Sequence, residues 1–119
     1  MTLEEVQREL RELSKLEPDW DSYGARSISD VAIGMSNRFL ETVVKQIGEQ
    51  IYLYAIVPIP DGGISLEWHT FKLDIGVDIS PEGKLGYLLV KHCGTEHTFE
   101  EREEVPWLDM INKVVEVMQ

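Results

Sequence analysis

The stretch that decides the fold is Phe71-Lys72-Leu73-Asp74-Ile75-Gly76-Val77-Asp78-Ile79, in which apolar and polar residues alternate without a break. Successive side chains of a β-strand point to opposite faces of a sheet, so this pattern predicts a strand with one buried face. Ser80-Pro81-Glu82-Gly83 follows it and has the composition of a turn. We therefore expect an antiparallel sheet at the centre of the fold.

Further strand patterns lie on both sides of this stretch. Before it, residues 51–58 and 64–68 are separated by the turn sequence Pro60-Asp61-Gly62-Gly63. After it, residues 85–89 continue the alternation, and a tight turn at residues 93–96 leads to a short strand near Phe99. The spacing predicts four to five consecutive strands.

Helical periodicity begins and ends the chain. Thr2 and Glu5 form a capping box for a first helix that ends before Pro18. A second helix is expected to begin after Ser27 or Ser29 and to end at Gly48, and a third to begin at Pro106. We predict a single α+β domain over residues 1–119: an antiparallel β-meander with two N-terminal helices and one C-terminal helix on one face.

Composition narrows the class of protein. The chain has 119 residues, 43% of them hydrophobic, and no apolar run near the roughly 20 residues that span a bilayer. Its opening residues lack a signal-peptide layout, and it has one cysteine, so we expect a cytoplasmic protein without membrane contact. The formal net charge of −11 disfavours direct nucleic-acid binding and favours a basic protein partner.

Apolar residues on both faces of the sheet predict association. If the odd-numbered residues of the third and fourth strands face the helices, Leu88, Val90 and Phe99 lie on the opposite face. Apolar side chains there need a cover, which the C-terminal helix, a second copy of the chain or another protein would supply. We expect a homodimer.

Two segments are candidates for chemistry or recognition. Trp20-Asp21-Ser22-Tyr23-Gly24-Ala25 is either a structural turn or a recognition surface presenting Trp20 and Tyr23. In the second segment, a two-residue turn at His69-Thr70 would place Glu67 opposite Lys72, whereas a four-residue loop from His69 would place it opposite Asp74. Facing carboxylates would need a proton or a cation between them.

Signatures of metal binding and catalysis are weak. His92 and His97 become cross-strand neighbours if Gly94-Thr95 is the turn, but Cys93 then points to the other face, and two imidazoles do not complete a zinc site. No nucleophile elbow, phosphate loop or dinucleotide fingerprint is present in the sequence. We expect no metal and no cofactor.

The segments Trp20–Ala25, Pro60–Gly63 and Leu66-Glu67-Trp68 resemble those of uncharacterised small bacterial proteins that carry W-D-x-Y-G-A and P-D-G-G-x-x-L-E-W segments. The resemblance covers roughly residues 18–80. It implies a shared fold without an established activity, and it implies that Trp20, Asp21, Gly24, Glu67 and Trp68 form one cluster.

These observations favour a non-catalytic, acidic protein-binding module, antitoxin-like or inhibitor-like, over an enzyme. Its expected binding residues are Trp20, Asp21, Tyr23, Glu67, Trp68, Glu100, Glu101, Glu103 and Glu104. The alternatives are a small metal-dependent or acid/base hydrolase that uses Asp21, Glu67, His69 and Asp74, and a purely structural assembly subunit.

Overall fold

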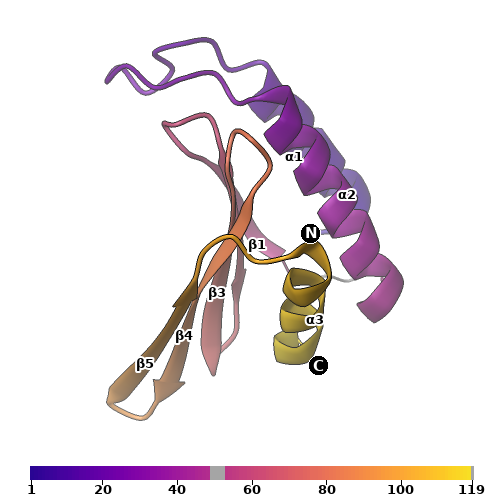
Figure 1. The fold of residues 1–119 in the computed structure, drawn as a ribbon, viewed down its shortest axis with the longest axis vertical. Helices are drawn as coiled ribbons and strands as arrows, with labels where there is room; N and C mark the ends of the chain where they lie inside the picture. The colour runs from indigo at the N-terminus through magenta and orange to yellow at the C-terminus, as the bar shows by residue number, and fades with distance from the viewer. Residues whose placement is uncertain (49–52, 119) are drawn as a thin grey trace.

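The computed structural model describes residues 1–48 and 53–118 and has the expected α+β architecture (Figure 1). The elements follow the chain as α1 (Leu3–Ser14), α2 (Asp30–Ile47), β1 (Leu53–Pro58), β2 (Ile64–His69), β3 (Leu73–Ile79), β4 (Leu85–Cys93), β5 (Glu96–Arg102) and α3 (Trp107–Met118). The strands form one antiparallel sheet in the order β1-β2-β3-β4-β5. Spatial order equals chain order, which makes the sheet a meander.

The three helices lie on the same side of the sheet (Figure 1). Strand side chains that point to this side are buried, as the alternating burial of β2, β3 and β4 shows. Helix α1 contacts β1, α2 contacts β2 and β3, and α3 contacts β4. We call this side of the sheet the inner face and the opposite side the outer face.

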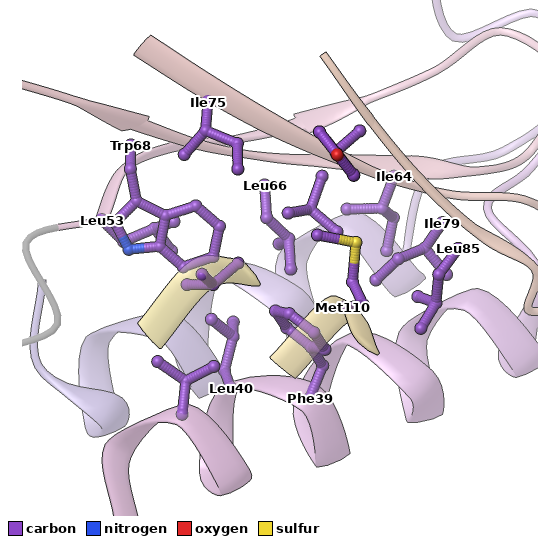
Figure 2. Close-up of a cluster of buried hydrophobic side chains, with 14 of the residues drawn as sticks. Phe39, Leu40, Leu53, Ile64, Leu66, Trp68, Ile75, Ile79, Leu85 and Met110 are labelled. Atoms are coloured by element: carbon purple, nitrogen blue, oxygen red, sulfur yellow. The ribbon is translucent and has the colours of Figure 1, made fainter. Parts of the chain in front are cut away.

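The core lies between the inner face and the helices (Figure 2). Phe39 of α2 stands edge-on to Trp68 of β2 and to Trp107 of α3, with ring centroids 6.5 and 5.8 Å apart. Edge-to-face pairs suit the charge distribution of aromatic rings and add to the free energy gained by burial. One aromatic residue thus joins the sheet to two helices.

The helix ends follow the local chemistry of the sequence. The Glu5 amide donates to the Thr2 hydroxyl at the start of α1. Ser29, and not Ser27, caps α2: its hydroxyl accepts from the Ala32 amide at 2.9 Å and donates to the Pro81 carbonyl at 2.7 Å. Gly48 ends α2 at a φ of 95°, which glycine adopts without steric cost.

The start of β3 and the register of the β2–β3 hairpin differ from both predictions. Glu67 lies opposite Gly76, and His69 lies opposite Asp74. The loop has the four residues of the longer alternative but lies one residue further along the chain, at residues 70–73, where the Thr70 hydroxyl accepts from the amides of residues 72 and 73. Phe71, predicted to belong to the strand, lies in this loop with 88% of its surface exposed.

At the edges of the sheet, the last strand departs from its predicted length and the first strand is described only in part. The first strand was predicted to begin at Ile51, which lies outside the described residues, and its described part begins at Leu53. The last strand is longer than predicted, since β5 takes in Glu100, Glu101 and Arg102. No helix among the described residues is long and apolar enough to cross a membrane.

Candidate functional site: the outer face of the sheet

No helix of the described residues 1–48 and 53–118 lies over the outer face of the sheet (Figure 1). Helix α3 packs on the inner face, so the structure excludes it from the three covers considered for Leu88, Val90 and Phe99. Leu88 and Phe99 remain 42% and 71% exposed. Tyr54, in the bulge of β1, and Val57 add exposed apolar surface along the other edge. The outer face therefore keeps several exposed apolar side chains that no described helix covers.

The charged groups on this face are carboxylates. They belong to Glu67, Asp74, Asp78 and Glu101. Cross-strand pairing and the alternation of side chains along each strand place all four on the outer face. No lysine or arginine occupies an outer-face position of the strands over the described range. The face therefore combines negative charge with apolar contact area.

Histidines form a row with two of these carboxylates. His69 lies between Glu67 and Asp74, with N···O distances of 3.7 and 3.6 Å, and its ring stacks on Tyr54 with centroids 4.3 Å apart. The other oxygen of Asp74 lies 2.9 Å from Nε2 of His92. Asp74 thus links two imidazoles, and protonation of either would give it an ion pair.

The row continues to the last hairpin. His92 and His97 are cross-strand partners, as predicted, and their Nδ1 atoms are 3.0 Å apart. At that distance one ring donates a hydrogen bond and the other accepts it. The described contacts join imidazoles to carboxylates, to each other and to an aromatic ring, and no hydroxyl or thiol is among their hydrogen-bond partners in these regions.

Asp78 is the outer-face carboxylate whose pKa is raised. The main cause is partial removal from water, and the nearby charges of Asp61 and Glu67 raise the pKa further, while a hydrogen bond from Ser65 lowers it. The Asp78 side chain retains solvent exposure, so its carboxylate is only partly removed from water and is not a buried charge.

Two shallow grooves cross the outer face. One, of about 310 Å³, runs between His69 and Leu88 over the small residues Ser65 and Gly76. The other, of about 330 Å³, runs from Asp61 past Gly86 to the end of β5. Asp78 and Leu88 line both grooves, so the two adjoin. Their open shape suits an extended segment or a side-chain row of another protein more than an enclosed small molecule.

The Trp20–Ala25 segment is a loop at the end of the sheet where β2 begins. Asp21 accepts from the amides of Tyr23 and Ala25, at 2.8 and 3.0 Å, and the Trp20 indole donates to the Arg26 carbonyl at 2.7 Å. The loop docks on Pro60, whose carbonyl accepts from the Arg26 amide. Asp21 and Trp20 therefore hold the loop, and Tyr23, 91% exposed, is its free aromatic side chain.

The structure does not bring the expected five-residue cluster together. Trp68 is fully buried in the core. It lies four residues beyond Ile64, the first residue of β2, so an extended strand places it about 13 Å from the end of the sheet where the Trp20–Ala25 loop docks. Glu67 points to the outer face. Asp21 stays with the loop near Pro60. Of the residues weighed for acid–base chemistry, Glu67, His69 and Asp74 are neighbours, and Asp21 is separate.

The acidic run of residues 100–104 is divided between two faces. Glu100 points to the inner side, where Lys113 of α3 lies 2.8 Å away; this ion pair lowers the pKa of the Glu100 carboxyl and raises the pKa of Lys113. Glu101 lies beside Leu88 on the outer face. Glu104 pairs with Lys84 at 3.1 Å, and Glu103 lines the second groove.

Metal binding gains no support from the side-chain positions. Among the described residues, no three His, Cys, Asp or Glu side chains are placed to hold one ion. Cys93 is exposed at the β4–β5 turn and alternates away from His92.

Sequence reasoning missed several members of the outer face. Tyr54, Asp78 and the contact between Asp74 and His92 were not anticipated. The alternation of β3 was enough to place Asp78 on the same face as Asp74, but the contact of Asp74 with His92 depended on the register of two hairpins. The comparisons do not extend the interpretation: no protein-family model matches the chain, and neither the curated proteins nor the solved structures gave a match.

Proposed function

We propose that the protein is a non-catalytic, acidic binding module of the cytoplasm that binds a basic protein through the outer face of its sheet. The observation that carries the proposal is that this face bears four carboxylates beside exposed apolar side chains and that no helix in the described part of the chain covers it. A partner with lysines or arginines around an apolar contact would satisfy both features.

The distribution of charge favours an inhibitor-like or antitoxin-like role. The four carboxylates are spread over β2, β3 and β5, so they present negative charge across the outer face and would compete with phosphate groups for a basic groove on the partner. Charge of this kind mainly raises the association rate, whereas the apolar contacts of Leu88 and Phe99 would slow dissociation.

The test compares matched charge reversals in capture from the native host lysate after nuclease treatment. Glu67→Lys/Asp78→Lys changes the outer face, and Glu4→Lys/Glu9→Lys changes the net charge equally on the exposed side of α1. We expect a stoichiometric basic protein to bind the wild type and the α1 variant and to be lost from the outer-face variant. Capture of no basic protein, or equal capture by all three, would contradict the proposal.

With the captured partner purified, the acidic run can be divided. Glu101→Lys should slow association about tenfold at low salt, because Glu101 lies on the outer face, while Glu104→Lys should have little effect since Glu104 already pairs with Lys84. Equal effects on the association rate would show that the outer face is not the contact surface.

A second candidate function rests on the contact of His69 with Glu67 and Asp74. This trio resembles an oriented general base, and it lines a groove. Hydrolysis of p-nitrophenyl acetate above the background of free imidazole, abolished by His69→Ala, would favour an acid/base hydrolase. We expect no such His69-dependent rate.

A further inference from the structure

Strand β5 is an open edge of the sheet. All seven of its residues, Glu96–Arg102, are exposed. Among the described strands β5 pairs with β4 alone, and Glu100 adds an ion pair with Lys113 of α3 on the inner side. The opposite edge has features that discourage pairing: β1 contains a bulge between Leu53 and Ala55 and ends at Pro58. Strand β5 has neither a proline nor a bulge, and its register with β4 is regular over seven pairs.

The backbone groups that face this open edge can be identified. The His92 amide donates to the Lys72 carbonyl on the β3 side, and the Leu85 carbonyl accepts from the Val105 amide on the β5 side. Because antiparallel strands alternate in the direction of their hydrogen-bonding groups, odd-numbered residues of β4 bond to β5. These residues pair with even-numbered residues of β5, such as Leu89 with Glu100. His97, Phe99 and Glu101 therefore direct their amides and carbonyls outward.

We propose that two copies of the chain pair through β5, antiparallel, about a twofold axis at Phe99. Outward-facing residues then meet one another: Phe99 lies opposite Phe99 of the second copy, and His97 opposite its Glu101. On the inner side, Glu96 lies opposite Arg102 of the second copy. Each unlike pair occurs twice because of the symmetry, so the contact contains four pairs in which an acidic residue faces arginine or histidine.

Other symmetric registers are less favourable. An axis at Thr98 places Glu96 opposite Glu100 of the second copy, and an axis at Glu100 places that residue opposite itself. Like charges directly opposite each other destabilise a strand pair. An axis at His97 avoids acidic like-charge pairs, but it places His97 opposite itself and Glu96 opposite Thr98, so it gains no pair of opposite charge. The axis at Phe99 alone combines outward backbone groups with pairs of an acidic residue and arginine or histidine and with no like-charge pair, so β5 is complementary to itself in that register.

This dimer would join two five-stranded sheets into one continuous sheet. Phe99, which is 71% exposed in one chain, would gain an aromatic partner across the axis, near Leu88 and Val90. The two outer faces would lie on the same side and double the acidic surface. The inference does not depend on the identity of any other partner.

The experiment measures the mass of the full chain by sedimentation and light scattering across a concentration series, in 0.15 M salt with a thiol reductant that keeps Cys93 from forming cross-links. We expect twice the chain mass of 13.7 kDa. Phe99→Pro removes an amide that points away from β4 and should abolish the dimer, whereas Leu108→Asp, at an exposed site on α3, should leave it intact.

A charge exchange tests the register. Arg102→Glu and Glu96→Arg should each weaken the dimer about tenfold, since each creates two like-charge contacts. The double variant Glu96→Arg/Arg102→Glu should restore the dissociation constant to within about threefold of the wild type. A monomer at every concentration, a dimer unaffected by Phe99→Pro, or single and double variants of equal strength would overturn the proposal. Circular dichroism of each variant separates loss of pairing from loss of fold.

Discussion

Gly63 shows how a single residue fixes the joint between the loops and the sheet. A Cβ atom at this position would lie 2.5 Å from the Ile79 carbonyl oxygen and 3.1 Å from the Asp61 carboxylate. The backbone at Ile79 cannot move away from such a Cβ atom without disturbing the pairing of Ile64 with Ile79, the first pair between β2 and β3. We expect Gly63→Ala to lower the free energy of unfolding by about 1–3 kcal/mol in urea titrations.

Gly34 is the matched control for that substitution. It lies in α2 with open space around it, so Gly34→Ala should raise stability by about 0.5–1 kcal/mol through helix propensity. Equal effects at the two positions would show that the close approach at Gly63 does not matter.

Asp78 makes a pH-dependent contribution that can be measured at the residue itself. Its pKa in the folded chain is raised above the ordinary value of 3.8, so folding favours the protonated form. The group therefore costs stability as pH rises through 3.8 and the folded pKa, and it costs nothing at lower pH. Asp78→Asn should gain stability relative to the wild type at pH 7, and the gain should shrink at pH 3. A gain that is the same at both pH values would contradict the raised pKa.

At the scale of elements, Ser29 connects α2 with the β3–β4 turn. Its hydroxyl caps the helix and also donates to the Pro81 carbonyl. Ser29→Ala should cost about 1–2 kcal/mol of unfolding free energy, since a cap and a tertiary hydrogen bond are lost together. Ser27→Ala, at the other serine that could have been the cap, should be close to neutral. The comparison by urea titration fails if the two substitutions cost the same.

Element types were predictable because their signals are local, whereas the hairpin register was not. The alternation of residues 73–79 and the capping residues Thr2 and Ser29 act within a few positions of the chain. The β2–β3 register depends on the Thr70 hydroxyl, which holds the four-residue loop one position further along the chain than the longer alternative placed it. The sequence therefore placed Glu67, His69 and Asp74 on one face but assigned them the wrong opposite partners.

At the scale of the whole molecule, the net charge of −11 predicts a stability that depends on salt. Raising ionic strength from 0.01 to 0.15 M shortens the screening length from about 30 to about 8 Å and weakens repulsion among the carboxylates. The urea midpoint should increase over this range. Glu4→Lys/Glu9→Lys, with less net charge, should gain less. A midpoint that falls with salt would mean that attractive pairs such as Lys113–Glu100 dominate.

The sequence predicted the helices on one face of the sheet, as the structure shows, but it left α3 open as a cover for the opposite face. Apolar periodicity shows that a helix such as α3 has a buried side, but it does not show which face of the sheet receives it. Helix α3 packs on the inner face because Met110 and Ile111 contact the core and Trp107 packs against Phe39. These are tertiary contacts, which the periodicity of the helix does not reveal. The same packing leaves apolar side chains of the outer face exposed.

The meander also governs how the chain assembles during synthesis. Each strand pairs with the strand made just before it, so β2, β3 and β4 can be added as they leave the ribosome. The amphipathic helices α1 and α2 emerge first and must wait for the sheet that they cover. Strand β5 is the last strand to emerge, and its outer edge stays unpaired. A nascent chain thus completes its own sheet before it exposes the edge through which another molecule could join.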